Sequence, residues 1–413
     1  MNKAESSEIG NYLESHGLER VNSAHEADIV ILNTCVVRQN AEDRATGMLG
    51  YLKGIKSEKT DMRIAVTGCL VDSDIAGLYK RFPHVNYFFS PGETVHFMDW
   101  LSSEIILRKI QADHNYLPDT MPVSAYVSII QGCNNYCSYC IVPYRRGNER
   151  SKSPEEILNS ANRLIEYGAK EITLVGQNVN AYGSDLKDGF DLAALLHKVN
   201  DLAGLERIRF LTNHPKDMSS SLIRALATLE KVCHQICLPL QSGDDKILIA
   251  MNRHYTAESY RSLVNQIKDS VPDIAITTDI IVGFPGESEA QFDNTCKAIQ
   301  EIRFDAVHVA AYSPRSGTYA SKNFDDNVPY EIKMQRLHHI ESLQTKILTE
   351  INQKLVGKTM EVLVEGKKGS KWYGRTGSDK LVFFTEAADF RGKLVKVHIT
   401  ASSPWALQGF LAD

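Results

Sequence analysis

Near the start of the chain, continuous apolar stretches alternate with helix-compatible segments. The apolar stretches end at Cys35, Cys69 and Ser90, and the helical segments cover Glu8–His16 and 38–56. Strands that are apolar on both faces and separated by helices are typical of a parallel sheet covered on both sides. No strand precedes the first helical segment, so we expect a sheet that lacks its first strand.

A second, longer alternation predicts a barrel in the middle of the chain. Its apolar strand candidates start at Ala125, Glu171, Arg207, Ile236, Ile274 and Ala306. The spacing leaves room for a helix after each strand, and six successive βα units predict a parallel barrel or partial barrel with its chemistry at the C-terminal strand ends. Ser153 and Glu156 predict a capping box that opens the first of these helices. The stretch before the barrel, roughly 94–122, is expected to be a linker.

The last eighty or so residues of the chain show a different pattern, a helical segment followed by short apolar stretches. Glu331–Leu355 has helical periodicity, and the short apolar segments MEVLVEG, KWYGRT, LVFF and KLVKVHI follow it, separated by glycines. Short strands of this kind predict a small closed barrel of the OB type. From Asn352 onward ten Lys and Arg stand against six Asp and Glu, so this tail carries +4 and the remainder −9 of the total of −5. A basic barrel on an acidic body favours an anionic partner.

Composition excludes several classes of protein. Hydrophobic residues make up 43% of the 413 residues and charged residues 23%, which is globular rather than disordered. No apolar run is long enough to span a bilayer, and the start has no signal-peptide pattern. Eight cysteines are too few for a disulfide scaffold in a chain of this length. We therefore expect a cytoplasmic protein with reduced thiols and no membrane contact.

Three of those cysteines stand close together in QGCNNYCSYC. Cys133, Cys137 and Cys140 have C-x₃-C-x₂-C spacing directly after a predicted strand. Three thiolates can hold three irons of a 4Fe–4S cube and leave the fourth iron open to a small molecule. A zinc site usually needs a fourth ligand, and none follows at short spacing. The alternative is three structural thiols, and the spacing favours the cluster.

At this point the chain resembles a known family. The segments GCNNYCSYCIVPYRRGNERS, LVGQNVNAYG, RIRFLTNHPKD, LPLQSG and DIIVGFPGE resemble those of the radical S-adenosylmethionine (SAM) methylthiotransferases. The resemblance implies a flavodoxin-like N-terminal domain (1–105), a radical SAM core with a partial (βα)6 barrel (119–350) and a C-terminal TRAM barrel (353–413).

The resemblance also implies roles for individual residues. Cys133, Cys137 and Cys140 would bind the 4Fe–4S cluster that binds SAM. Tyr139 would pack on the adenine of SAM, and Gly176 and Gln177 would meet its amino group. The alternatives are an ordinary loop tyrosine at 139 and, at 177, a polar side chain that satisfies loop carbonyls.

Two further cysteines end strands of the N-terminal sheet. The ends of parallel strands meet at one edge, so Cys35 and Cys69 can converge, although two buried core cysteines would give the same pattern. The resemblance makes them ligands of an auxiliary 4Fe–4S cluster, with the third cysteine expected two residues upstream of Met1. Either the start was assigned at an internal methionine, or the protein lacks one ligand and an inner strand. Other cysteines are expected to be structural: Cys233, Cys237 and Cys296.

Two basic groups are candidates for RNA contact. Arg145 and Arg146 follow the cysteine motif, and Lys371 and Arg375 interleave with Trp372 in the tail. They form either solvated charged surfaces or sites of phosphate contact and base stacking.

The resemblance implies a transferase acting on tRNA. It would add a methylthio group to C2 of N(6)-dimethylallyladenosine next to the anticodon, at position 37, and use two SAM and the auxiliary cluster as sulfur carrier. Alternatives are threonylcarbamoyladenosine in tRNA or a ribosomal protein as substrate and, in a different class, a non-catalytic iron–sulfur RNA-binding sensor. The expected partners are tRNA, a low-potential electron donor and a sulfur donor, and we expect a monomer.

Overall fold

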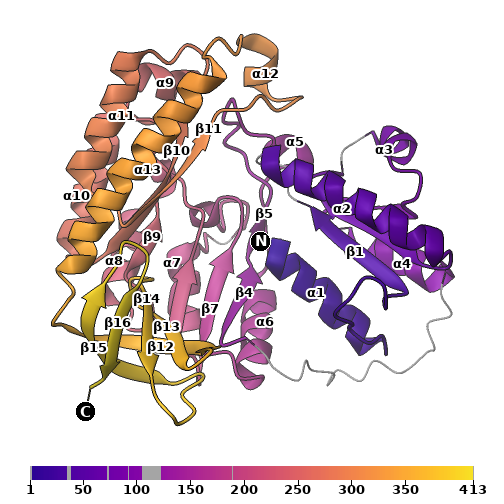
Figure 1. The fold of residues 1–413 in the computed structure, drawn as a ribbon, viewed down its shortest axis with the longest axis horizontal. Helices are drawn as coiled ribbons and strands as arrows, with labels where there is room; N and C mark the ends of the chain where they lie inside the picture. Colours follow the sequence, from indigo (N-terminus) through magenta and orange to yellow (C-terminus); the bar gives the residue numbers. More distant parts are fainter. Residues whose placement is uncertain are drawn as a thin grey trace. The chain divides into compact units, whose positions relative to one another are not determined.

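Figure 1 shows the computed structural model of the protein. The structure describes residues 2–34, 39–71, 74–91, 93–104, 122–187 and 189–412, so Cys35 lies outside the described residues. Two compact units make up the chain. The first holds 1–120, 131–135 and 140–148, and the second holds 121–130, 136–139 and 149–413.

The first unit is built on a parallel three-stranded sheet. Its order is β1 (Ile29–Thr34), β2 (Arg63–Gly68), β3 (Tyr87–Phe88), and Ile29 lies opposite Arg63. The helices α1 (Asn2–Ser15) and α4 (Thr94–Glu104) pack on one face, and α2 (Gln39–Glu58) and α3 (Ile75–Arg81) on the other. The expected parallel sheet covered on both faces is confirmed.

Part of the expected linker is helical. Residues Thr94–Glu104 form α4, so the linker prediction is wrong there. Phe97, Met98 and Leu101 share one buried face against Phe89 of the sheet. An apolar face of only three residues is a weak periodic signal in a sequence.

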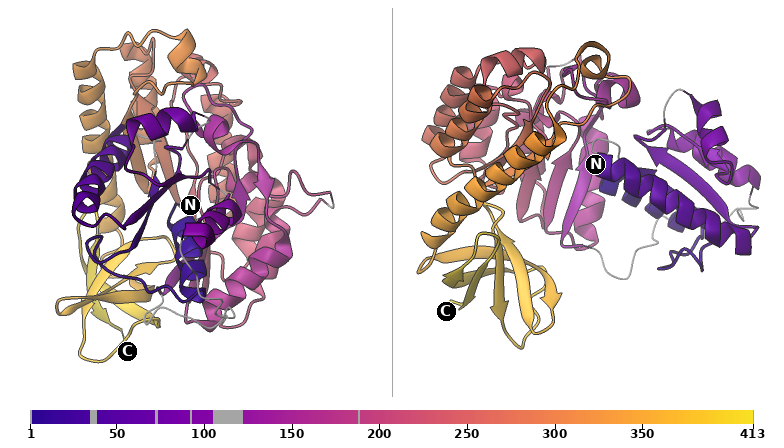
Figure 2. Two further views of the ribbon diagram at one scale, coloured as in Figure 1. Left: turned by 90° about the vertical axis from the view of Figure 1, so that its right-hand side faces the viewer. Right: turned by 45° about the horizontal axis from the view of Figure 1, so that its top comes forward.

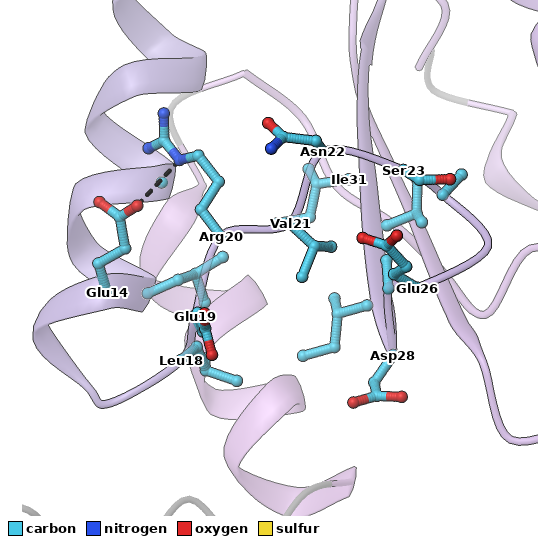
Figure 3. A pocket seen from close by; sticks show the side chains of 16 residues that line it. Glu14, Leu18, Glu19, Arg20, Val21, Asn22, Ser23, Glu26, Asp28 and Ile31 are labelled. Atoms are coloured by element: carbon cyan, nitrogen blue, oxygen red, sulfur yellow. Dashed lines mark ion pairs between the residues drawn. The ribbon is translucent and has the colours of Figure 1, made fainter. Parts of the chain in front are cut away.

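Strand β1 has one strand partner among the described residues, β2. A hollow of about 520 Å³ lies between β1, the end of α1 and the loop that joins them. Figure 3 shows Val21 and Ile31 among its lining, with Arg20 joined to Glu14 at 2.9 Å. The apolar side chains of β1 are only half-buried beside this hollow, whereas those of the central strand β2 are almost all buried.

The second unit contains the six barrel strands expected from the sequence. They are β4 (Ser124–Ser128), β7 (Glu171–Val175), β8 (Arg207–Phe210), β9 (Gln235–Cys237), β10 (Ala275–Val282) and β11 (Ala306–Ala311). They form two parallel sheets, β4-β7-β8 and β9-β10-β11, linked by a bridge between Ile208 and Val232. The partial barrel is confirmed.

Helices surround these strands (Figures 1 and 2). They are α6 (Pro154–Glu166), α7 (Leu192–Asn200), α8 (Ser220–Thr228), α9 (Asp245–Ala250), α10 (Ala257–Ser270), α11 (Glu289–Ile302), α12 (Tyr319–Asn323) and α13 (Tyr330–Gln353). Ser153 and Glu156 form the expected capping box at the start of α6. Two short strands, β5 (Ile130–Gln131) and β6 (Arg150–Ser151), flank the cysteine loop and α5 (Val142–Arg146) along the chain. No helix of the described segments has the length and apolarity that crossing a membrane requires.

The C-terminal strands close into the expected small barrel. It runs β12 (Thr359–Lys368), β13 (Lys371–Thr376), β14 (Leu381–Thr385), β16 (Leu407–Leu411), β15 (Leu394–Ser402) around its circumference. The sequence pattern predicts four of these strands but not β16. This barrel belongs to the second unit and joins the N-terminal ends of the core strands. There the buried Arg209 binds Glu171 at 2.9 Å and donates to Thr376 O at 2.7 Å.

Candidate cluster and cofactor site

The loop that carries Cys133 is shaped by the glycine before it. Gly132 has a φ of 76°, and an added Cβ would overlap the backbone of Asn148. Only glycine satisfies both requirements. The Cys133 N–H donates to Gly147 O at 3.1 Å, and Asn135 Nδ2 donates to Cys133 Sγ at 3.5 Å.

In the second unit, Cys137 faces a buried arginine. Cys137 is 8% exposed, and Arg253 Nη1 lies 3.4 Å from its Sγ. Arg253 also donates to Pro239 O at 3.0 Å and to the Tyr255 hydroxyl at 2.9 Å. Burial acts to lower the pKa of Arg253, but Tyr139, Tyr255 and Cys137 outweigh it and raise that pKa. A permanent cation therefore lies within hydrogen-bonding distance of this sulfur.

Neighbouring residues fix the loop around Cys137. Ser138 N donates to Met251 O at 3.0 Å, and the Ser138 hydroxyl donates to Ala250 O at 2.7 Å. Tyr139 packs against the apolar cluster that contains Met251 and Phe284. Cys140 is half-buried, and none of Cys133, Cys137 and Cys140 forms a disulfide bond.

Across the described ranges, no group of three His, Cys, Asp or Glu residues is arranged to hold a metal ion. A 4Fe–4S cube spaces its thiolates further apart than one ion does, because each sulfur binds a different iron. Two of the three cysteine sulfurs, those of Cys133 and Cys137, accept an N–H from a side chain.

In the first unit, Cys69 follows β2 and accepts a hydrogen bond from Arg146. The Nε–Sγ distance is 3.4 Å, and Arg146 Nη1 and Nη2 bind Glu5 of α1 at 2.5 and 3.2 Å. Burial acts to raise the pKa of Glu5, but Arg146 outweighs it and holds that pKa below its ordinary value. The partner expected for Cys69, Cys35, lies outside the described residues.

The structure corrects two expectations about RNA contact. The Arg146 side chain is 2% exposed and committed to Glu5 and Cys69, so it is not a phosphate-binding surface residue. Trp372 is 6% exposed in the core of the small barrel, so it does not offer its ring to a base. In each case the basic or aromatic pattern of the sequence suggested an exposed residue, but the side chain is buried in the structure.

The other candidate RNA residues remain accessible to different degrees. Arg145 is half-buried, and burial lowers its pKa. Lys371 is exposed and donates to Gln408 at 3.4 Å. Arg375 is 39% exposed and pairs with Glu365 and Asp379 at 3.5 and 3.2 Å.

The segment after β7 carries Gly176 and Gln177. An added Cβ on Gly176 would overlap the side chain of Ile130 and come within 2.8 Å of its carbonyl oxygen. Close packing of two strand ends therefore explains this glycine without a ligand. The structure places Gln177 next along the chain, at the C-terminal end of a barrel strand.

The remaining cysteines sit in protein interiors. Burial raises the pKa of Cys233 and of Cys296 to about 11 and that of Cys237 to about 12. These thiols stay protonated near neutral pH, in keeping with structural roles.

One conspicuous polar residue forms part of a loop. His214 is buried, and its backbone exchanges two hydrogen bonds of 2.8 Å with the Asn180 side chain. Burial lowers the pKa of His214 to about 2, so its ring is neutral.

Arg253 is a site residue that the sequence did not reveal, because nothing in its local sequence distinguishes it from a surface arginine.

Comparison with known proteins identifies three parts of the chain. Residues 127–299 match the radical SAM superfamily, residues 1–90 the uncharacterized protein family UPF0004, and residues 353–411 the TRAM domain. A solved radical SAM methyltransferase, TsrM of Kitasatospora setae, has a similar fold. Its TM-score is 0.56 at 13% identity, over 72% of this chain and 68% of that one.

Relatives similar along the whole chain share one name, tRNA-2-methylthio-N(6)-dimethylallyladenosine synthase. The protein of Dehalococcoides mccartyi strain 195 is 47% identical over 100% of this chain and 96% of its own length. That of Acetivibrio thermocellus is 43% identical over 99% of this chain and 88% of its own length. Radical SAM membership implies 4Fe–4S and SAM as cofactors. The chain belongs to the family of tRNA-2-methylthio-N(6)-dimethylallyladenosine synthases, radical SAM enzymes that transfer a methylthio group to tRNA.

Proposed function

We propose that Cys133, Cys137 and Cys140 bind the 4Fe–4S cluster at which SAM is cleaved. The observation that carries this proposal is the buried guanidinium of Arg253, 3.4 Å from Cys137 Sγ. A thiolate in a dry environment needs such a donor, whereas a structural thiol does not. When bound, the reduced cluster supplies the electron that cleaves the sulfonium of SAM.

The protein residues bind and orient the reactants. Tyr139 lies next to the last cysteine and contacts the adenine of SAM, and Gly176 and Gln177 lie near its amino group. The position of Gly176 and Gln177 at a C-terminal strand end supports this assignment, since barrel enzymes bind substrates there. The tight packing at Gly176 keeps the backbone of this segment close to the neighbouring strand.

We infer that Cys69 and Cys35 bind the auxiliary cluster, the sulfur carrier of the reaction. The hydrogen bond from Arg146 to Cys69 supports this role, because the sulfur ligands of iron–sulfur clusters accept hydrogen bonds that tune the cluster. Arg146 is thus a positioning residue that links Cys69 to Glu5. We therefore do not propose that it contacts RNA.

The substrate contacts proposed for tRNA are Arg145, Lys371 and Arg375.

Residues 1–105, 119–350 and 353–413 form the auxiliary-cluster, radical SAM and TRAM domains. We expect the reaction at position 37 of the tRNA to take place in the cytoplasm. We expect a monomer that receives electrons from a low-potential donor and sulfur from a separate sulfur donor.

The test is mass spectrometry of tRNA nucleosides from a strain that lacks this protein. The proposal predicts that 2-methylthio-N(6)-dimethylallyladenosine disappears and that its unthiolated precursor accumulates. Complementation with the wild-type gene should restore the modified nucleoside, and complementation with Cys137→Ala should not. Persistence of the modified nucleoside in the deletion strain would refute the proposed substrate.

A further inference from the structure

A second cavity lies in the second unit, away from the cysteine loop. It has a volume of about 470 Å³ and lies between the inner face of β9–β11, helix α13 and two turns of the small barrel. Its lining includes Gln235, Cys237, His308, Asn352, Lys380 and Trp405. Gln235 is the first residue of β9, whereas the cysteine motif follows the C-terminal end of β4. The lining also includes Leu211 and Thr212, which follow the C-terminal end of β8, so the cavity extends from the start of β9 to the end of β8.

The charges around this cavity pair with one another. Lys380 Nζ lies 2.8 Å from Asp305, and Arg375 Nη1 lies 3.2 Å from Asp379. Burial raises the pKa of Cys237 to about 12, so its thiol is neutral. Because these cations already face carboxylates, the lining suits a neutral polar ligand better than a phosphate or a metal ion.

Two buried amides in the lining have oxygen atoms without a hydrogen-bond partner within the described parts of the chain. They belong to Gln235, which is 4% exposed, and Asn352, which is 1% exposed. A buried carbonyl oxygen without a donor is costly, and Gln235 is one of the residues that line the cavity. A side-chain amide pairs well with a base edge that carries a donor beside an acceptor.

An exposed indole lies at the same cavity. Trp405 is 69% exposed, whereas Trp372 is in a core. The turn that carries Trp405 is fixed, because Asn352 Nδ2 donates to Ser403 O at 2.8 Å and to Pro404 O at 3.0 Å. A solvent-exposed aromatic ring on a fixed turn is the arrangement that proteins use to stack single-stranded bases.

We propose that this cavity binds one nucleobase of an RNA strand, stacked on Trp405 and read by the amide of Gln235. The inference rests on the tRNA substrate of the family. Since none of the residues that line the cavity belongs to the cysteine motif, the bound base is a second one, distinct from the base that is modified. The site would hold the RNA across the junction between the radical SAM core and the small barrel.

The test uses the full-length protein and a short oligo(A) strand. Alanine substitution of a stacking aromatic weakens binding by roughly five- to one-hundred-fold, so Trp405→Ala should raise the Kd for oligo(A) by that factor. Trp405→Phe keeps an aromatic ring and should recover most of the affinity. An abasic oligomer of the same length should bind the wild type and Trp405→Ala equally, because it offers no base.

The matched control is Phe410→Ala, since Phe410 is 54% exposed on the same small barrel and does not line the cavity. It should leave the Kd within about two-fold of the wild type, below the loss expected for a stacking residue. Equal losses in both variants, equal affinity for oligo(A) and the abasic oligomer, or no binding by the wild type would overturn the proposal. Failure of the proposed methylthiotransferase would instead appear as a wild-type protein that does not cleave SAM.

Discussion

The buried ion pair between Arg146 and Glu5 gives the sharpest prediction about the first unit. Their side chains are 2% and 12% exposed, and Arg146 Nη1 lies 2.5 Å from Glu5 Oε1. Arg146→Met removes the cation and leaves a buried carboxylate without its partner. Breaking a buried pair on one side costs about 3–5 kcal/mol, so this variant should lose that much stability in its first unit.

The double variant Arg146→Met, Glu5→Leu distinguishes the cost of an unpaired buried charge from the cost of lost packing contacts. Replacing both partners of a buried pair with apolar residues is often neutral, so the double variant should recover most of the loss. Hydrogen exchange of α1 and β2 in the anaerobic apoprotein measures the effect locally. Arg44→Met, a change at an exposed arginine on α2, is the control and should leave the hydrogen exchange of α1 and β2 unchanged.

The pH dependence of this effect has a definite sign. Arg146 holds the pKa of Glu5 below its ordinary value, so the stabilisation is complete above that ordinary value. It is lost as the pH falls through the lowered pKa of the folded protein. The advantage of the wild type over Arg146→Met should therefore shrink in acid. A single variant as stable as the wild type at neutral pH would refute the reasoning.

Three other substitutions test the cluster site, the SAM-binding segment and a helix cap. Arg253→Met should reduce the iron retained after anaerobic reconstitution, measured per chain, because Cys137 loses its cationic donor. Gly176→Ala should weaken SAM binding in a calorimetric titration, since the added methyl overlaps Ile130 and displaces the segment that precedes Gln177. Ser153→Ala removes the cap of α6 and should cost roughly 1 kcal/mol in urea unfolding, with unchanged iron content. A stability equal to that of the wild type would contradict the capping argument.

The strands were predictable because their signal is local. Apolar runs such as the one that ends at Cys69 indicate buried parallel strands, and the spacing of Cys133, Cys137 and Cys140 indicates the cluster chemistry that we propose. Burial of charged residues was not predictable. Arg146 lies 141 residues from Glu5 in the chain, and only the fold shows that its guanidinium is buried.

Other features were missed for a related reason. Arg253 contacts Cys137 from 116 residues away, so no local pattern reveals it. Trp372 looked like a stacking residue because basic residues surround it in sequence, yet its side of β13 faces the barrel core. Strand β16 is short and contains a glycine, which weakens its alternation.

Formation of 5′-deoxyadenosine from SAM tests the central claim most directly. After anaerobic iron–sulfur reconstitution and chemical reduction, the wild-type protein should release 5′-deoxyadenosine, detected by chromatography. Cys137→Ala should release none, because the three-thiolate site loses one ligand. A wild-type protein that leaves SAM intact, or a Cys137→Ala variant that cleaves it as fast, would contradict the assignment of these cysteines.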